Sequence, residues 1–506
     1  MPKKYPIGIQ SFDKLREENF LYIDKTPFLH DLVNSAGYYF LSRPRRFGKS
    51  LFVNTIEALF QGKKELFKGL FIEDKWNWEQ TNPVIKISFS NIDHKEIGLS
   101  KAIKIELRSL AKKNGFELES ESNGLMFREL IETIAQKNGK VVVLIDEYDK
   151  PIIDYLGEDT DKALENQSIL KGFYSILKDA DDYLRMVFIT GVSKFSRVSI
   201  FSDLNNLRDL TTNKEFAGIC GITQKELENN FTEELRLYDN EKIKLWYNGY
   251  TWDLNTKVYN PFSLLNFFVE QGEFKNYWFV TGTPTFLINL SKKRHFFDFE
   301  GITLYLEELG AYGIEKIDLV PLMFQTGYLT LKKQNEDDSY ELDYPNLEVR
   351  RSFLSVLANA YIQDDANSGA ILANKLKHSL ENGDLEKVQQ ILNTLFKSIP
   401  YTLWQKENEH FYHAIIHLIF KLLGIYADSE VQTSDGRMDA LVRLEKYVYC
   451  FEFKLDESAE MALAQIEKKE YLTPYLHQNK TCIGIGVNFS KEEKKVKEFI
   501  WKKFSA

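Results

Sequence analysis

Short apolar runs alternate with longer amphipathic stretches along the N-terminal part of the chain. The runs have the length of single strands and lie at residues 38–41, 83–90, 140–145 and 184–190. Between them, apolar residues recur with helical spacing near 97–112, 124–137 and 161–179. Strands that alternate with helices predict a parallel sheet with helices on both faces, which is an α/β fold.

The pattern changes after residue 205. From about 206 to 345 it is helical and irregular, and aromatic residues cluster with Gly and Pro at 246–252 and 259–262. We interpret these clusters as packed turns of a helical lid, since core packing explains them better than stacking on a base. A hairpin is expected at 329–342, followed by helices as far as residue 425. The predicted domains are therefore 1–205, 206–365 and 366–506.

The first apolar run leads into a loop that ends in Gly48-Lys49-Ser50, and a helical pattern follows. A phosphate-binding loop has this strand–loop–helix setting. Gly48 lets backbone amides approach a phosphate, Lys49 is expected to pair with the β- and γ-phosphates of an NTP, and the Ser50 hydroxyl to hold Mg²⁺. Arg43 stands where the general pattern has glycine, so the loop needs a partner motif.

That partner follows the apolar run at 140–145, where Asp146 and Glu147 stand at the strand end. Ligands of open α/β sheets bind at the carboxyl ends of the strands. Asp146 suits a Mg²⁺ ion, and Glu147 suits the polarisation of an attacking water. Thr190 or Ser193, after the next strand, is placed to sense the γ-phosphate, with an ordinary turn as the alternative. Each cluster alone is as readily a plain helix start or strand end, but together they favour an NTP site.

The sequence predicts a helix shortly before this loop, with Pro27 at its first position and Asp24 or Thr26 as its cap. Its nearness to the loop makes the segment a candidate for the adenine side of the pocket. A plain packing role is at least as good an interpretation.

Composition sets wider bounds. A chain of 506 residues exceeds a single core, so two or three domains are expected. The sequence has no apolar run of about eighteen residues, which argues against a membrane span, and its N-terminus lacks the apolar core of a signal peptide. Three scattered cysteines fit a reducing cytosol. The net charge of −9 argues against a protein coated in nucleic acid and leaves a local basic groove open.

A second cluster of charged residues lies in the C-terminal part. If Glu445-Lys446 is a two-residue turn, the flanking strands place Asp439 directly opposite Glu452, and every residue on the other face is apolar. Facing carboxylates repel each other unless a divalent cation joins them. Lys454 lies on the same face, where it can orient a water or stabilise a pentacovalent phosphate. This arrangement suits metal-dependent phosphodiester hydrolysis.

The helical pattern after this hairpin returns Gln465 toward the same edge of the sheet. The alternative to a catalytic site is a surface hairpin with cross-strand charge pairs, which the apolar inner face disfavours. His410, His413 and His417 have helical spacing and can gather on one helix face. Since no fourth ligand accompanies them, a partly buried face is a better interpretation than a metal site.

With both clusters in view, the chain resembles a two-part bacterial family. Its N-terminal half is similar to the predicted AAA-ATPase-like domain, through segments at 22–26, 42–50, 146–151, 247–250 and 259–262. Its C-terminal part is similar to the PD-(D/E)XK nuclease domain that accompanies it, through segments at 436–439, 452–454 and 464–466. In this family an arginine at position 43 is the norm.

The resemblance implies a cytoplasmic ATPase fused to a Mg²⁺-dependent nuclease that acts on nucleic acid, which we expect to be DNA. It implies ATP and Mg²⁺ as cofactors. The implied nucleotide-binding residues are Arg46, Gly48, Lys49, Ser50, Asp146 and Thr190, with Ser50 and Asp146 also holding the metal. The implied catalytic residues are Glu147, Asp439, Glu452, Lys454 and Gln465, with Asp439 and Glu452 as metal ligands.

Other features are left open at this point. An assisting acidic residue on an early helix maps to Glu409 or, less well, to Glu430. A homo-oligomer is open, as is an arginine finger at Arg197 or Arg208, where ordinary surface arginines are the better interpretation. Two other functions compete: a signalling or defence NTPase whose nuclease-like domain binds nucleic acid or a partner without cleaving, and a scaffold without turnover.

Overall fold

The computed structural model describes most of the chain. The described residues are 4–35, 37–194, 200–201, 204, 206–279, 285–293, 298–310, 313–314, 318–361, 369–397, 409–426, 428–434, 437–490, 492–493 and 495–505. They form two compact units, one made of Met1–Phe286 with Phe299–Glu348 and the other of Leu287–Asp298 with Val349–Ala506. The predicted division at 205/206 and 365/366 stays a prediction.

Unit 1 is built on a parallel sheet, as the alternating pattern predicts. Its strands lie in the order β2 (Val84–Ser88), β3 (Val141–Asp146), β4 (Leu184–Gly191), β1 (Gly37–Ser42) and β5 (Leu207–Asp209). Every neighbouring pair in this sheet is parallel. Because the strands are parallel, the loop after β1 and the acidic end of β3 lie at the same edge of the sheet, with β4 between the two strands.

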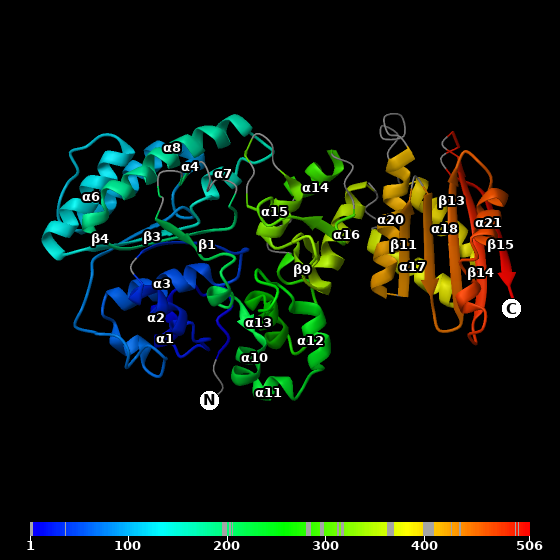
Figure 1. Ribbon diagram of the computed structural model, residues 1–506, viewed down its shortest axis with the longest axis horizontal. Coiled ribbons are helices and arrows are strands. Elements are labelled where there is room, and N and C mark those ends of the chain that lie inside the picture. Colours follow the sequence, from blue (N-terminus) through cyan, green and yellow to red (C-terminus); the bar gives the residue numbers. More distant parts are fainter. Residues whose placement is uncertain are drawn as a thin grey trace. The chain divides into compact units, whose positions relative to one another are not determined.

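Helices cover both faces of this sheet. Figure 1 shows α4, α6, α7 and α8 on one face and α1, α2 and α3 on the other. Their bounds are α1 (Phe12–Glu17), α2 (Thr26–Asn34), α3 (Lys49–Phe60), α4 (His94–Ile97), α5 (Leu99–Lys113), α6 (Asn123–Asn138), α7 (Lys150–Ile153) and α8 (Thr160–Asp179). The three helices predicted between the strands are therefore present as α5, α6 and α8.

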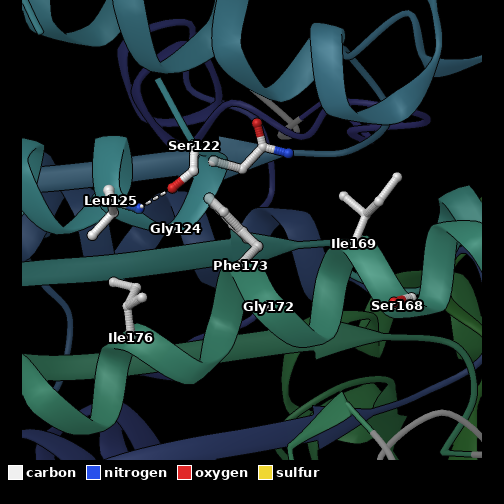
Figure 2. A pocket seen from close by; sticks show the side chains of 9 residues that line it. Ser122, Gly124, Leu125, Ser168, Ile169, Gly172, Phe173 and Ile176 are labelled. Carbon is white, nitrogen blue, oxygen red and sulfur yellow. Dashed lines mark hydrogen bonds between the residues drawn. The ribbon is translucent and has the colours of Figure 1, made fainter. Parts of the chain in front are cut away.

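Local signals explain where α6 begins and ends. The Ser122 hydroxyl accepts from the backbone N–H of Leu125, and Gly139, with φ of 84°, terminates the helix. A shallow pocket of about 370 Å³ lies between the start of α6 and α8, and Figure 2 shows the side chains that line it. A Cβ on Gly124 would lie 3.0 Å from the Gly172 carbonyl oxygen, so glycine allows the close approach of the two helices. None of the predicted site residues lines this pocket.

The rest of unit 1 is helical and aromatic, as predicted. Its elements are β6 (Ile222–Thr223), α10 (Gln224–Asn230), α11 (Thr232–Leu235), α12 (Asn240–Tyr247), β7 (Val258–Tyr259), α13 (Pro261–Val269), β8 (Ile302–Leu304), α15 (Leu319–Thr326), β9 (Thr330–Gln334) and β10 (Tyr340–Asp343). The predicted hairpin is the antiparallel pair β9–β10. The clustered aromatics are core residues, since Trp246, Tyr247 and Tyr259 are buried in one cluster.

Unit 2 holds a mixed sheet in the order β11 (Asp428–Ser434), β12 (Arg437–Arg443), β13 (Tyr447–Leu455), β14 (Thr481–Ser490) and β15 (Lys495–Phe504). Only the β13–β14 pair of this sheet is parallel, and α21 (Ala459–Lys468) connects these two strands. The remaining helices are α14 (Thr285–Lys293), α16 (Leu347–Tyr361), α17 (Gly369–Glu381), α18 (Leu385–Lys397) and α20 (Glu409–Tyr426). The first two residues of α14 and of α16 belong to unit 1.

The register predicted for the C-terminal hairpin is confirmed. Asp439 pairs with Glu452 across β12 and β13, and the Leu444 N–H donates to the Tyr447 carbonyl at 2.8 Å across the predicted turn. On the apolar face, Phe420 of α20 packs against Phe451. Among the described helices, none is long and apolar enough to cross a bilayer.

Candidate functional site

Two residues with positive φ shape the loop between β1 and α3. Arg46 has φ of 68°, and Gly48, the N-cap of α3, has φ of 95°. Within the described chain, none of the backbone N–H groups of residues 45–50 donates to a protein acceptor. Consecutive free amides at the start of a helix form an anion-binding concavity. The loop therefore has the geometry that a phosphate site needs.

The carbonyls of the same loop are hydrogen-bonded on its other side. Lys49 Nζ donates to the carbonyls of Arg43 and Pro44, each at 2.9 Å. Trp278 Nε1 donates to the Arg45 carbonyl at 3.0 Å, and the Gly221 N–H to that of Phe47 at 3.0 Å. These bonds fix the backbone of the loop through its carbonyl groups.

Arg43, which replaces the first glycine of the general pattern, is a fully buried tether. Its guanidinium donates to the carbonyls of Thr211 at 2.8 Å and Phe216 at 3.4 Å, and lies 4.0 Å from the ring centroid of Trp252. Burial lowers the pKa of Arg43 to about 10. Sequence reasoning missed this role, because the partners lie far along the chain.

The acidic end of β3 lies beside the loop. Asp146 is 6% exposed, and no hydrogen-bond partner of its Oδ1 exists among the described residues. Burial raises the pKa of this carboxyl, against a hydrogen bond from Ser50 and the charge of Lys49. Thr190, at the end of β4, is likewise buried, and its hydroxyl has no hydrogen-bond partner in the part of the chain that the structure describes. These oxygens are hard ligands of the kind Mg²⁺ takes, so the residues present fit a nucleotide-bound metal.

Neighbouring residues fix the rest of the edge. Glu147 has φ of 52° and accepts a hydrogen bond from Ser90. The buried carboxylate of Asp149 accepts from the N–H and the hydroxyl of Ser193, at 2.7 and 2.6 Å. Because the Ser193 hydroxyl is used in this way, Thr190 is the better of the two γ-phosphate candidates.

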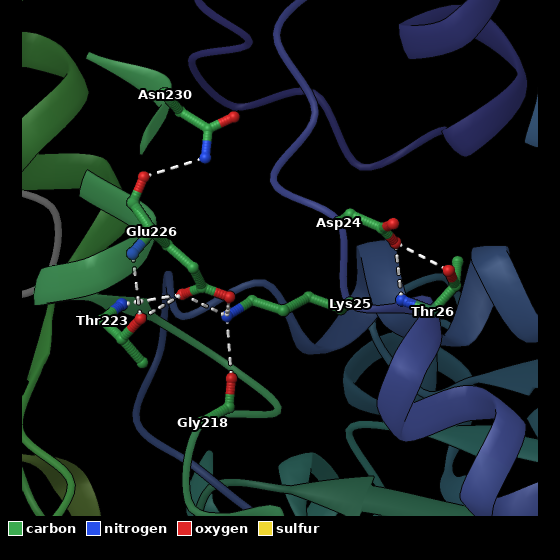
Figure 3. A network of polar contacts seen from close by, with 7 residues as sticks. All are labelled: Asp24, Lys25, Thr26, Gly218, Thr223, Glu226 and Asn230. Atoms are coloured by element: carbon green, nitrogen blue, oxygen red, sulfur yellow. Dashed lines mark hydrogen bonds and ion pairs between the residues drawn. The ribbon is translucent and has the colours of Figure 1, made fainter. Parts of the chain in front are cut away.

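The segment before α2 has a packing role. Lys25 Nζ lies 2.6 Å from Glu226 Oε1 and donates to the Gly218 carbonyl at 2.7 Å, and Asp24 accepts from the Thr26 N–H at 2.8 Å (Figure 3). The Lys25 and Thr26 side chains are buried. These bonds join the N-terminal segment to α10, so packing explains it better than contact with adenine.

The second charged cluster lies on β13. Glu452 is fully buried, and Lys454 Nζ lies 3.3 Å from its Oε1 and 3.0 Å from Oε1 of Gln465 on α21. Glu452 Oε2 and Gln465 Nε2 are buried without a hydrogen-bond partner in the described chain. A buried carboxylate oxygen with no partner is costly in isolation and suits a divalent cation. The structure thus brings together three of the predicted residues.

The remaining candidates divide as follows. Asp439 is placed by its backbone opposite Glu452, but its side chain and those of Glu409, His410, His413 and Glu430 lie outside the described part, as does Arg197 entirely. Among the described residues, no group of three His, Cys, Asp or Glu side chains has the geometry of a metal site.

Two of these candidates have ordinary structural surroundings. His417 is buried, and its Nε2 lies 3.3 Å from Asp298 Oδ2. This pairing fits the interpretation of the three histidines as a partly buried helix face. Arg208 is paired with Glu215 at 3.1 Å, as an ordinary surface arginine is.

Asn488 and Glu498, which sequence reasoning missed, anchor α21 over the site. Glu498 accepts from the Ala459 N–H at 2.9 Å, and buried Asn488 exchanges hydrogen bonds with the Glu457 backbone. In the sheet, Asn488 pairs with both Lys454 and Glu498. An asparagine within the otherwise apolar run at 482–489 was the available signal.

Comparisons with known proteins match the two parts of the chain to two families. A family model described as "Predicted AAA-ATPase" matches residues 6–201, and one described as "PD-(D/E)XK nuclease superfamily" matches residues 407–499. The chain is 38% identical to the "Uncharacterized protein in vnfD 5'region" of Azotobacter chroococcum mcd 1, covering 98% of each chain. It is similar to the Aeropyrum pernix ORC1 protein in complex with DNA at 13% identity, over 81% of this chain and 85% of that one. With a TM-score of 0.26, that likeness carries no conclusion.

Proposed function

Because the chain belongs to the family of predicted AAA-ATPases that carry a C-terminal PD-(D/E)XK nuclease superfamily domain, we propose that unit 1 binds and hydrolyses ATP while unit 2 cleaves nucleic acid. The unused amides of residues 45–50, beside the buried and unpartnered oxygen of Asp146, carry the proposal for unit 1. We further propose DNA as the substrate and the cytoplasm as the compartment.

In unit 1 the chain's own groups divide the work. The amides of the loop, with Gly48 at the start of α3, receive the phosphates, and Arg46 adds a positive charge at the loop's exposed edge. Lys49 exchanges its bonds to the Arg43 and Pro44 carbonyls for the β- and γ-phosphates. Ser50 and Asp146 would hold Mg²⁺, which neutralises phosphate charge when bound. Glu147 orients the attacking water, and Thr190 contacts the γ-phosphate.

In unit 2, Asp439 and Glu452 would hold the divalent ion, which supplies Lewis-acid polarisation of the phosphodiester. The register that opposes these residues and the unpartnered Oε2 of Glu452 support this assignment. Lys454 orients the attacking water or donates to the developing phosphate charge, and Gln465 holds Lys454 in place through their 3.0 Å hydrogen bond.

ATP hydrolysis by the full chain tests the first half of the proposal. We expect Lys49→Ala to lose ATP binding, and Glu147→Gln to retain binding but lose about 10²-fold or more in kcat. Lys112→Ala, which removes an exposed lysine of α5, is the control and should match the wild type. Turnover that survives Lys49→Ala unchanged would contradict the assignment of Lys49, and a wild-type chain without turnover would leave the scaffold function in its place.

Cleavage of DNA with and without Mg²⁺ tests the second half. We expect Asp439→Ala, Glu452→Gln and Lys454→Ala each to abolish cleavage while the chain still binds DNA. If the wild-type chain binds DNA, hydrolyses ATP and never cleaves, unit 2 is a binding domain of an NTPase. The bonding of Lys454 Nζ to Glu452 and Gln465 makes that alternative worth the test, because the lysine must give up a partner to reach a phosphate.

A further inference from the structure

The last strand of unit 2 presents a basic and aromatic edge. β15 lies at the end of the sheet, where β14 is its only partner among the described strands, and Figure 1 shows it as the outermost strand. Trp501 is 50% exposed although it is a large apolar residue. Four exposed lysines share the strand with it. We call these residues, Lys495, Lys497, Trp501, Lys502 and Lys503, the β15 edge.

The outward charge of this edge is positive although the whole chain carries −9. Glu498 is the one acidic residue of β15, and its carboxylate accepts from the Ala459 N–H and from Asn488 on the side covered by α21. Val496 is buried, and its N–H donates to Asn393 of α18. The strand therefore turns its acidic and aliphatic groups inward and its lysines outward.

Surface ion pairs at the β15 edge involve two of its four lysines. Lys495 pairs with Glu493 and Lys502 with Glu467, each at 2.7 Å, and all four side chains are at least 40% exposed. Exposed pairs of this kind contribute about 0–1 kcal/mol. A phosphate can replace such a carboxylate at little cost.

Protection of a sheet edge explains only part of this composition. Lysines on an edge strand prevent pairing with another strand, but a half-exposed tryptophan works against that purpose. An aromatic ring between lysines is instead what binds unpaired bases, because the ring stacks on a base while the lysines follow the phosphates. The charge and the ring together favour a nucleic-acid strand over a protein strand as the occupant.

The β15 edge is also close to the proposed cleavage site. Ile500 pairs with Gly486, which pairs with Glu452, so one row across the sheet joins β15 to the proposed metal ligand. With neighbouring strands about 4.8 Å apart, β15 runs about 10 Å from β13. The side chain of Lys502 lies on the same face of the sheet as Glu452, and that of Trp501 lies on the opposite face. A strand of nucleic acid that follows the edge can therefore contact both side chains.

We propose that the β15 edge binds a single-stranded segment of nucleic acid, with its lysines on the phosphates and Trp501 stacked on a base. The inference rests on the proposed function of unit 2. It adds a substrate class, since single strands or single-stranded flanks would be preferred to a continuous duplex.

Fluorescence anisotropy of the full chain with a short labelled oligothymidylate tests this proposal. The binding measurements use the Glu452→Gln background in EDTA, so that the oligonucleotide is not cleaved. We expect Trp501→Ala to weaken binding about 5- to 150-fold, the effect of removing one stacking residue, and Trp501→Phe to restore most of it. Lys497→Gln with Lys503→Gln should lower the slope of log Kd against log salt by about 1.4. A duplex of the same length should be bound more weakly than the single strand.

The controls are Phe71→Ala, which removes an aromatic residue that is 45% exposed in unit 1, and Lys112→Gln with Lys113→Gln. Unchanged affinity in Trp501→Ala would overturn the inference, as would a change of oligomeric state in place of a change of affinity. If Mg²⁺-dependent cleavage still requires Glu452 in that case, the proposed function stands without the β15 edge. If the wild-type chain neither binds nor cleaves nucleic acid, the proposed function itself is wrong.

Discussion

Restoring the general phosphate-loop pattern by Arg43→Gly is expected to destabilise the protein. The guanidinium is fully buried, donates to the carbonyls of Thr211 and Phe216, and lies over Trp252. Hydrogen bonds of charged groups contribute about 1.5–3 kcal/mol each. We therefore expect the free energy of unfolding of unit 1 to fall by roughly 3 kcal/mol, measured by urea denaturation, and the affinity for ATP to fall with it.

Arg208→Gly is the matched control for this change. The Arg208 side chain is 43% exposed and pairs with an exposed glutamate, so its loss should cost under about 1 kcal/mol. If Arg43→Gly were as stable as the wild type and bound ATP more tightly, Arg43 would not stabilise the loop and the prediction would be wrong.

Glu348 makes the stability of unit 1 depend on pH. It is fully buried, accepts from the Ser263 hydroxyl and the Trp278 N–H, each at 2.7 Å, and burial raises its pKa from 4.5 to about 7. Between these two values the folded state holds the proton more tightly than the unfolded state. The contribution of this carboxyl is therefore complete below about pH 4.5 and is lost as the pH rises through 7, a change of roughly 3 kcal/mol.

Glu348→Gln tests this titration, because the amide oxygen still accepts from Ser263 while the charge is removed. We expect the difference in unfolding free energy between variant and wild type to move in favour of the variant by roughly 3 kcal/mol between about pH 4.5 and about pH 8. All other titrating groups are common to both proteins and cancel in the difference. A difference that does not vary with pH would contradict the assignment.

These residues show where sequence reasoning stops. The positions of Gly48, Lys49, Ser50 and Asp146 at a helix start or a strand end could be predicted from local patterns, whereas their roles stay a prediction. The partners of Arg43 lie about 170 to 210 positions along the chain, and no local spacing identifies them. Ser193 shows the same limit, because only the structure reveals that its hydroxyl is bonded to Asp149.

At the scale of elements, one carboxylate of β15 holds the start of α21. Glu498 on β15 accepts from the N–H of Ala459, the first residue of α21, and this helix carries Gln465 to Lys454. Glu498→Ala leaves that N–H without its partner, so we expect a loss of about 1–3 kcal/mol in unfolding free energy. Because the position of Gln465 depends on the helix, the rate of DNA cleavage should fall more than the affinity for DNA.

Glu498→Gln distinguishes the loss of the hydrogen bond from the loss of the charge. Its amide oxygen can still accept from the Ala459 N–H, so this variant should recover most of the cleavage activity. Stability is measured by urea denaturation of the full chain, and kcat and KM are measured on a short DNA. A normal kcat in Glu498→Ala, at a temperature where the variant is folded, would show that α21 does not depend on this bond.

Whole elements were more predictable than their assembly. Alternation alone predicted the register of β12 and β13, because a slip of one residue would mix their apolar and charged faces. Apolar runs predicted the strands of the first sheet. Nothing in the spacing indicated that β4 lies between β3 and β1, or that residues 287–298 belong to unit 2, since both depend on contacts between distant segments.

At the scale of the molecule, one bonded path leads from the phosphate loop to the helix that enters unit 2. Trp278 Nε1 donates to the Arg45 carbonyl at 3.0 Å, and the Trp278 N–H donates to Glu348 Oε1 at 2.7 Å. Glu348 lies in the first turn of α16, which continues into unit 2. A loop that moves when it takes up a phosphate would pull on this tryptophan and so on α16.

Trp278→Phe tests whether this path couples the two activities. It removes the indole bond to Arg45 and keeps a ring between the loop and Tyr328, so ATP hydrolysis should stay within a few-fold of the wild type. A neutral hydrogen bond is worth about 0.5–1.5 kcal/mol, so its loss can remove a coupling of at most about tenfold. We therefore expect ATP to change the cleavage rate of the wild type. The ratio of the rates with and without ATP should be up to tenfold smaller in Trp278→Phe. Trp246→Phe, at a buried tryptophan of α12, should couple as the wild type does. If ATP changed the cleavage rate of all three proteins by the same factor, the hydrogen bond of Trp278 to Arg45 would not couple the two activities. Removing a bond that couples them must weaken the effect of ATP on cleavage.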